Sequence, residues 1–178
     1  YIFYTIYDRI SAITPLQGKY MTITIDELKR IVHKALTKYG YSEGEIAIIR
    51  EVLLYAQLRG NNQGVVKLTS KGFARAEVPD EIKIVKETKL SALINGNQHS
   101  GMVVMDKGMR MALQKAKEHG FGIVGMNNTN TSTGAIGYFA HEIAEKGFIG
   151  FVYAGSPETV PAYGSYQGIF GTNPLAIG

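Results

Sequence analysis

Apolar residues recur at helical spacing in two stretches near the start of the chain. Residues 28–36 carry them every three or four positions, directly after Thr24–Glu27, a capping box in which the Thr hydroxyl and the Glu carboxylate can satisfy free backbone N–H groups. A second box at Ser42–Glu45 begins a similar pattern that continues to about residue 59. The two patterns predict a helical hairpin, which the run Gly60–Gly64 ends abruptly.

The second half of the chain alternates short apolar runs with one long amphipathic stretch. The expected elements are, in order, strands at 82–87 and 90–94, a helix at 102–118, a buried strand at 121–126, a helix at 134–146 and another buried strand at 148–155. The last three of these elements have the spacing of a parallel βαβ unit. The sequence therefore predicts the α/β class, with an N-terminal helical hairpin followed by a βαβ-containing domain.

The amino-acid composition argues against several kinds of binding partner and site. The 178 residues carry a net charge of +4, and the basic residues are interspersed with acidic ones, so we expect no nucleic-acid partner. No apolar run approaches the ~18–20 residues of a membrane span, so we expect no membrane partner. The absence of cysteine excludes disulfides, thiolate metal sites and a thiol nucleophile. With no convincing signal peptide, the expected localisation is cytoplasmic.

Both ends of the chain are unusual. The sequence begins with Tyr1 rather than Met, and orderly helix chemistry starts only after Met21. We expect residues 1–20 to be a leader outside the fold; an edge strand or a disordered leader are the alternatives. At the other end, the chain stops at Gly178 inside an expected strand, so we expect the domain to be truncated there.

The segment between the expected strand at 121–126 and the next helix has the strongest chemical signal. Residues 127–133 can all form hydrogen bonds and carry no charge, and Gly134 and Gly137 would let a ligand or a backbone come close. In α/β sheets, ligands bind outside the carboxyl ends of strands, where helix N-termini present free amides. The spacing is G-x-x-G, not the Rossmann fingerprint. The alternative is that Ser132 or Thr133 only caps the helix.

The four histidines have no metal-ligand spacing, so we expect no metal site. His99 is the only one in an expected loop, which makes it a candidate for acid–base chemistry. The others fall on expected helices and have simpler structural explanations.

Five segments together resemble a known family. They are EVLLYAQLRGNNQGVVKL (51–68), KETKLSALINGN with the following glycine (86–101), KAKEHGFGIVGMNN (115–128), STGAIGYFAHEIAEKGFIGF (132–151) and GTNPLAIG (171–178). In their order and spacing they are similar to the NAD(P)-dependent malate/L-lactate dehydrogenase family, which is unrelated to the Rossmann-fold enzymes and includes ureidoglycolate dehydrogenase, sulfolactate dehydrogenase and 2,3-diketogulonate reductase. The resemblance covers residues 21–178.

The resemblance implies a fold, a cofactor and a reaction. It implies an α/β fold with a non-Rossmann dinucleotide-binding topology, usually in a homodimer, and hydride transfer between NAD or NADP and a small 2-hydroxyacid or 2-oxoacid such as malate or lactate. It also implies substrate binding by Asn62 and Lys67, and cofactor binding by Thr133, Gly134, Gly155, Ser156, Thr172, Asn173 and Pro174. The resulting domains are the leader at 1–20, a helical segment with the substrate loop at 21–68, and the first part of the NAD(P)-binding domain at 69–178.

The chain departs from the family pattern at the two histidines expected to handle the proton. Gln63 and Ser132 stand at those positions, and Lys67 replaces an arginine that grips the substrate carboxylate. Neither glutamine nor serine is a usual proton donor near pH 7. One alternative is therefore a catalytically inactive nucleotide-binding homologue or gene fragment. In the other, a different residue supplies the proton, with His99, Lys67 and Tyr138 as candidates.

Overall fold

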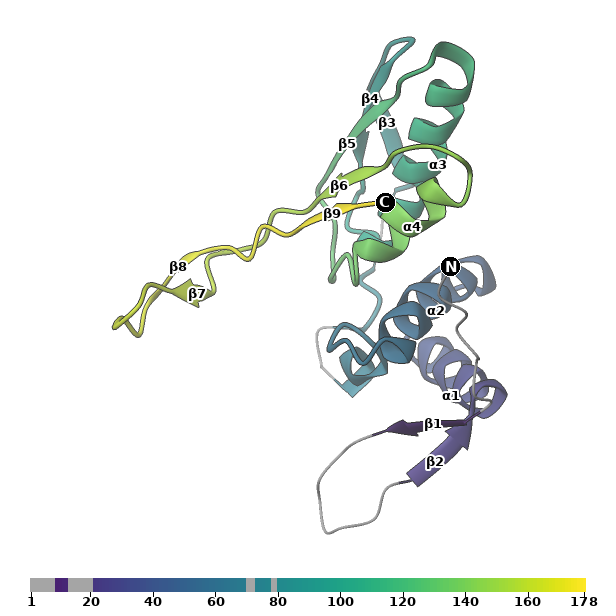
Figure 1. Cartoon of the computed structure of the whole chain (residues 1–178), viewed down its shortest axis with the longest axis vertical. Coiled ribbons are helices and arrows are strands. Elements are labelled where there is room, and N and C mark those ends of the chain that lie inside the picture. The colour runs from purple at the N-terminus through teal and green to yellow at the C-terminus, as the bar shows by residue number, and fades with distance from the viewer. Residues whose placement is uncertain (1–8, 13–20, 70–72, 78–79) are drawn as a thin grey trace. The chain divides into compact units, whose positions relative to one another are not determined.

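The computed structural model describes residues 9–12, 21–69, 73–77 and 80–178 (Figure 1). By its internal contacts the chain forms two compact units, Tyr1–Ala74 and Arg75–Gly178, which are described separately below. Among the described residues, no helix combines the length and the apolar composition that crossing a membrane requires.

The first unit is built on the predicted helical hairpin. Helix α1 (Ile25–Lys38) packs against α2 (Glu43–Leu58), and both begin where the capping sequences indicate. The Thr24 hydroxyl accepts a hydrogen bond from the Glu27 amide at 3.1 Å, and at Ser42 both halves of the capping box form. The shared core contains the buried residues Val32, Leu36, Ile46, Ile49, Val52 and Leu53.

Two short strands and a 3₁₀ helix flank the hairpin. Strand β1 (Arg9–Ala12) pairs antiparallel with β2 (Met21–Thr24), which runs directly into α1. After α2, the chain makes a short 3₁₀ helix, η1 (Val65–Thr69), and the buried ring of Phe73 lies against Tyr41, whose hydroxyl donates to the Phe73 carbonyl at 3.0 Å.

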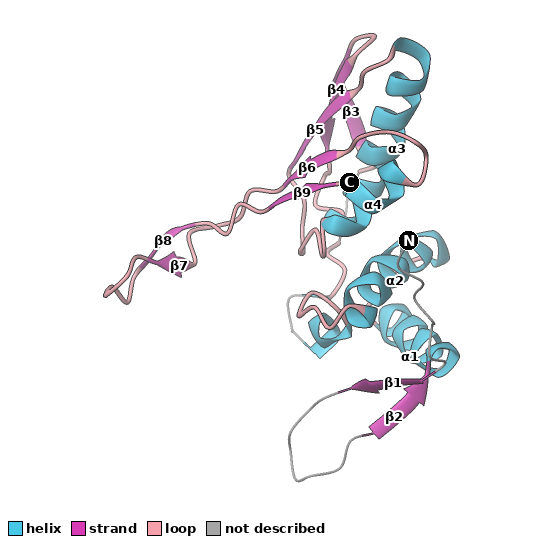
Figure 2. Ribbon diagram, in the orientation of Figure 1, coloured by secondary structure: helices cyan, strands magenta, loops and turns pink. Residues whose placement is uncertain are grey.

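The second unit contains a three-stranded sheet with the order β3-β4-β5. Strands β3 (Lys83–Glu87) and β4 (Ser91–Asn95) form the antiparallel hairpin, and β5 (Ile123–Asn127) pairs parallel with β4. Helix α3 (Gly101–His119) connects β4 to β5 and lies along one face of the sheet (Figure 2). Ile94, Met102 and Val104 are fully buried in this layer.

The βαβ unit lies one step earlier in the chain than the spacing predicts. Its members are β4, α3 and β5, whereas β6 (Phe151–Tyr153) does not pair with β5. Instead, β6 pairs antiparallel with β9 (Leu175–Ile177), and β7 (Val160–Pro161) pairs with β8 (Gly168–Phe170) further along the same ribbon. The ribbon extends away from the helices of its unit (Figure 1). The partner of β6 is thus β9, more than 20 residues later in the chain, and the spacing of the strands does not reveal such a non-local pairing.

The helix expected at 134–146 is shorter, and α4 spans Gly137–Ala144. Gly134 has a φ of +72° and Gly147 a φ of +82°, and neither value is compatible with a right-handed helix. The two glycines therefore restrict the helix to the residues between them.

The two strands expected to be buried are largely exposed, which corrects that prediction. Ile123 is 57% exposed, and Phe151 and Tyr153 are 59% and 67% exposed; only Val152 of β6 is buried. Continuous apolar strands are typical of sheets covered on both faces, whereas α3 covers one face of the β3–β5 sheet and α4 packs against β6 and β9.

A close approach between α3 and the start of β5 requires glycine at position 122. A Cβ atom on Gly122 would lie 2.2 Å from the carbonyl oxygen of Ala112, a backbone atom that cannot move aside. We expect Gly122→Ala to lower the free energy of unfolding by about 1–3 kcal/mol, measured by chemical denaturation. Gly125→Ala is the matched control, because a Cβ there would meet only the Leu93 side chain at an ordinary 3.4 Å. Equal stability of the two variants would contradict this packing.

Candidate functional site

The parallel pairing of β4 and β5 brings two polar loops to one edge of the sheet. Asn95 and Asn127 are register partners at the carboxyl ends of the two strands. The loops that follow run side by side: the Asn130 amide donates to the His99 carbonyl at 2.9 Å, and the Gly101 amide donates to the Asn130 carbonyl at 3.0 Å. The segments carrying His99 and Ser132 therefore meet in space, as a ligand site at the strand ends requires.

Glycine makes the contact between the two loops possible. A Cβ on buried Gly101, the first residue of α3, would lie 3.0 Å from the backbone of Ser132 and Thr133. Thr131 adds a side-chain bond, since its hydroxyl donates to the Ser100 hydroxyl at 3.2 Å. The start of α3 is thus held directly against the segment that precedes α4.

The backbone of these two loops is strained. Of the five described non-glycine residues with positive φ, four lie here: Asn97, Gln98, Asn128 and Thr131, at +45°, +62°, +52° and +46°. A left-handed conformation is tolerated by asparagine but is a marked outlier for β-branched threonine. Such conformations cluster at functional sites, where surrounding interactions hold them in place.

Residues Ser132, Thr133 and Gly134 form a half-exposed turn rather than a helix cap. The Ser132 hydroxyl accepts from the Gly134 amide at 3.0 Å, whereas α4 begins later and no side chain caps it. The alternative in which Ser132 or Thr133 caps the helix is therefore wrong. The segment is not sealed beneath other side chains, so its polar groups remain accessible to a ligand.

His99 is half-buried and its ring is anchored. Its Nε2 atom lies 3.2 Å from the Asp80 carbonyl oxygen. Because a carbonyl oxygen can only accept, this contact places the proton of the neutral ring on Nε2. Tyr138, the other candidate in this unit, is half-buried in α4 and packs edge-on against Phe139.

The expected cofactor residues of the ribbon form a second cluster, between the β6–β9 pair and the β7–β8 pair. The Ser156 hydroxyl accepts from the Thr172 amide at 2.7 Å and lies 3.0 Å from the Thr172 hydroxyl. The Ser156 amide donates to the Asn173 side chain at 3.4 Å, and the Ala154 amide donates to the Pro174 carbonyl at 3.2 Å. Asn173 has a φ of +38°. A Cβ on adjacent Gly155 would meet nothing within 4 Å, so there is open space beside this cluster.

The remaining candidates lie in the first unit, in the turn between α2 and η1 and in η1 itself. Asn62 is exposed, while Gln63 and Lys67 are half-buried. The Gln63 amide donates to the Asn61 side chain at 2.8 Å, and the Gln63 side chain donates to that of Asn62 at 3.3 Å. Gln57, which the sequence did not single out, accepts from the amide of Val65, the first residue of η1, at 3.1 Å. Its side chain thereby ties η1, which carries Lys67, to α2.

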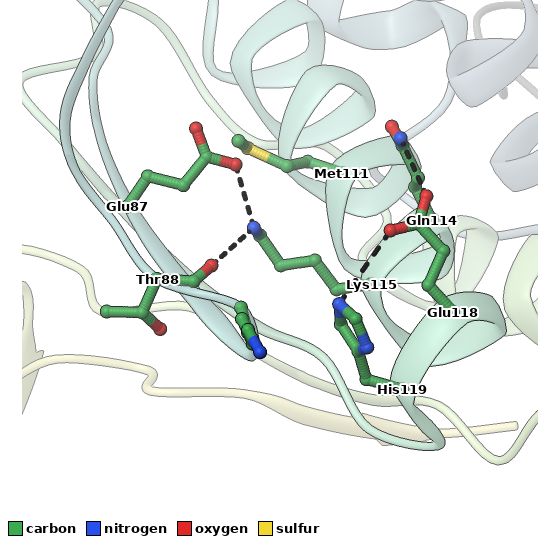
Figure 3. A pocket seen from close by; sticks show the side chains of 8 residues that line it. Glu87, Thr88, Met111, Gln114, Lys115, Glu118 and His119 are labelled. Carbon is green, nitrogen blue, oxygen red and sulfur yellow. Dashed lines mark hydrogen bonds and ion pairs between the residues drawn. The ribbon is translucent and has the colours of Figure 1, made fainter.

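A shallow pocket of about 300 Å³ lies elsewhere, between the β3–β4 turn and the last turns of α3 (Figure 3). Buried Lys115 reaches across it and donates to the Glu87 carboxylate at 2.7 Å and to the Thr88 carbonyl at 2.8 Å. This is the amino end of the parallel strands, opposite the polar loops, and none of the candidate residues lines it. The pocket therefore marks a structural ion pair rather than the candidate site.

Other charges pair locally. On α3, the Arg110 guanidinium donates to the buried Asp106 carboxylate at 2.7 Å, and this hydrogen bond and the attraction between the charges raise the pKa of Arg110. No group of three metal-ligating side chains is found in the described part of the chain. The candidate loops are lined by uncharged amide and hydroxyl groups instead.

Comparison with known proteins decides the family. The family model described as malate/L-lactate dehydrogenase matches residues 23–178. The chain belongs to this family. It is 37% identical over 163 residues to a malate dehydrogenase of Pyrococcus abyssi, covering 89% of this chain and 45% of that protein. It is also 34% identical to a malate/(S)-sulfolactate dehydrogenase of Methanothermus fervidus, covering 88% and 48%.

Solved structures of the family share the fold. Malate dehydrogenase from Pyrococcus horikoshii OT3 matches with a TM-score of 0.79 and 31% identity, over 99% of this chain and 49% of that chain. Sulfolactate dehydrogenase from Methanocaldococcus jannaschii matches with a TM-score of 0.75 and 30% identity, over 85% and 45%. The chain thus spans about half the length of the family members it matches. The family resemblance is confirmed, whereas the individual site residues stay predictions.

Ser156 should hold the two ribbon segments together between the β6–β9 and β7–β8 pairs. Removing its hydroxyl with Ser156→Ala deletes the acceptor of the Thr172 amide, a loss worth about 1 kcal/mol. We expect amide hydrogen exchange at Thr172 to speed up by about fivefold. Ser165→Ala is the control, because that hydroxyl bonds only near the ribbon tip. Unchanged exchange at Thr172 in the Ser156 variant would show that the cluster is held in another way.

Proposed function

We propose that the chain is part of an NAD(P)-dependent oxidoreductase that transfers a hydride between the nicotinamide and a small 2-hydroxyacid or 2-oxoacid. Family membership supports this, because the related proteins are named malate, sulfolactate and ureidoglycolate dehydrogenases. Malate and sulfolactate are both 2-hydroxycarboxylates. The structural observation that carries the proposal is the accessible pair of polar loops at the carboxyl ends of β4 and β5.

The chemistry of the candidate residues fits a dinucleotide. Thr133, Gly134, Gly155, Ser156, Thr172, Asn173 and Pro174 offer hydroxyl, amide and backbone groups without a carboxylate, as an anionic pyrophosphate requires. The space beside Gly155 leaves room for a ligand to approach the backbone. When bound, NAD or NADP would supply the hydride chemistry.

The protein's own residues would bind the substrate carboxylate and move one proton. Lys67 is the proposed carboxylate-binding group, acting as a point charge rather than as a two-pronged guanidinium. His99 is the proposed proton donor or acceptor. We further propose that the protein acts as a homodimer, as the family resemblance implies.

An inactive nucleotide-binding homologue is the second candidate. It is favoured by Gln63 and Ser132, which stand where the family resemblance expects histidines. Neither side chain titrates near neutral pH, so neither replaces the lost acid–base chemistry directly.

Lys67 gives a direct test of substrate binding. With NADH or NADPH and a panel of 2-oxoacids, we expect turnover by the parent protein. Lys67→Ala should raise KM for the oxoacid by about tenfold or more, because one hydrogen-bonded charge pair is lost. Lys67→Arg should leave KM for the oxoacid close to the value of the parent protein. Lys86→Ala, at an exposed position, is the control for a simple loss of positive charge. If the parent protein shows no turnover and binds no cofactor, the oxidoreductase proposal is refuted.

His99 and Gln63 separate the two candidate functions. If His99 handles the proton, His99→Ala should lower kcat by about 100-fold or more and remove one limb of the pH profile. If the parent is inactive but binds dinucleotide, Gln63→His should create measurable activity. Turnover by the parent would exclude the inactive homologue, and an unchanged pH profile in His99→Ala would exclude His99.

A further inference from the structure

Three side-chain amides connect the loops after β4 and β5 through hydrogen bonds in which each amide donates to the next. The Gln98 side-chain NH₂ donates to the Asn128 oxygen Oδ1, and the Asn128 Nδ2 donates to the Asn95 oxygen Oδ1 at 2.8 Å. Asn95 Oδ1 accepts a second bond, from the Asn97 amide at 3.0 Å. Asn128 is thus both acceptor and donor, and its side chain joins the end of β5 to the end of β4.

The backbone of Asn128 joins the same network. Its carbonyl accepts from the Gln98 amide at 2.8 Å, and its φ of +52° turns the chain out of β5. Gln98 is itself left-handed, at +62°. Two left-handed residues on different loops are therefore fixed to each other by one backbone and one side-chain hydrogen bond. Since the Asn128 and Gln98 side chains are exposed to water, these bonds add little to global stability.

The network determines where the candidate catalytic segment lies. Two residues beyond Asn128, Asn130 bonds the backbone on either side of Ser100, and Ser132 lies two residues further along the chain. One residue beyond Gln98 lies His99. A shift of either loop would therefore displace His99 and Ser132 relative to each other. Displacements of about 1 Å at a reacting group can cost about 100-fold in rate.

We propose that Asn128 is a positioning residue for the oxidoreductase reaction, which holds the His99 loop against the Asn130–Ser132 segment through its side-chain amide. The inference rests on the proposed function for its catalytic consequence. The positioning itself can be measured without any turnover.

Because each amide in the network acts as a donor or as an acceptor at a known atom, two isosteric Asn→Asp variants differ in their expected effect. One keeps its hydrogen bonds and the other loses one. Asn95 contributes only an acceptor oxygen, so Asn95→Asp keeps both of its hydrogen bonds. Asn128→Asp loses its donor and places a carboxylate oxygen against Asn95 Oδ1. Rotation of the Asn95 amide cannot repair this loss, because its NH₂ would then face the Asn97 N–H. Both variants add one negative charge at neighbouring positions, so charge alone cannot separate them.

We expect amide hydrogen exchange at Gly101 and Asn130 to speed up by about fivefold to tenfold in Asn128→Asp and by less than about twofold in Asn95→Asp. Asn128→Gly is the second variant: glycine adopts the positive φ without strain, so the fold is retained while the amide is removed. This variant should also speed up amide hydrogen exchange at Gly101 and Asn130. Equal exchange in Asn95→Asp and Asn128→Asp, or parent-like exchange in Asn128→Gly, would overturn the proposal.

Steady-state kinetics of the same variants test the catalytic consequence. Asn128→Gly should lower kcat by about tenfold or more while KM for the oxoacid stays within about threefold, because Lys67 is untouched. If the parent protein shows no turnover, the proposed function fails, and the exchange experiment still decides the positioning role. If exchange accelerates but kcat is unchanged, the network is structural only and the proposal is refuted.

Discussion

The parallel pairing of β4 with β5 is the constraint on which the second unit depends. It requires a crossover long enough to return the chain to the same end of the sheet, and α3 supplies it. Since both strands then end at the same edge, the loops that follow them must share that edge. Asn95 and Asn127 are register partners, and Ser100 and Asn130 form a further parallel bridge beyond the strands. The candidate site is therefore a consequence of sheet topology rather than of any local motif.

The two ends of this βαβ unit use different chemistry. At the amino end, buried Lys115 pairs with Glu87 and a backbone carbonyl, which fixes α3 on the hairpin turn. At the carboxyl end, the loops are held by amides, hydroxyls and backbone groups around left-handed residues such as Asn128. Because these donors are uncharged, they are not already paired with a carboxylate. An anionic ligand could bind them without competing against a fixed negative charge, as it would have to do at an ion pair.

The departures from the family pattern define the chemical question that this protein poses. Gln63 and Ser132 retain hydrogen-bonding ability but do not titrate near neutral pH. His99, on a neighbouring loop of the second unit, is brought beside the Ser132 segment by the Asn130 hydrogen bonds. Under the proposed function, His99 would supply the acid–base chemistry from the loop beside Ser132.

The sequence by itself determined the elements whose causes are local. Capping at Thr24 and Ser42 and helical spacing predict α1 and α2, because these interactions span only three or four residues. Only the tertiary structure decided that β6 pairs with β9, that Ile123 is exposed, and that Gln98 meets Asn128, 30 residues away. An apolar run shows that a strand forms but not what covers it, since coverage and pairing depend on segments that lie far apart in the chain.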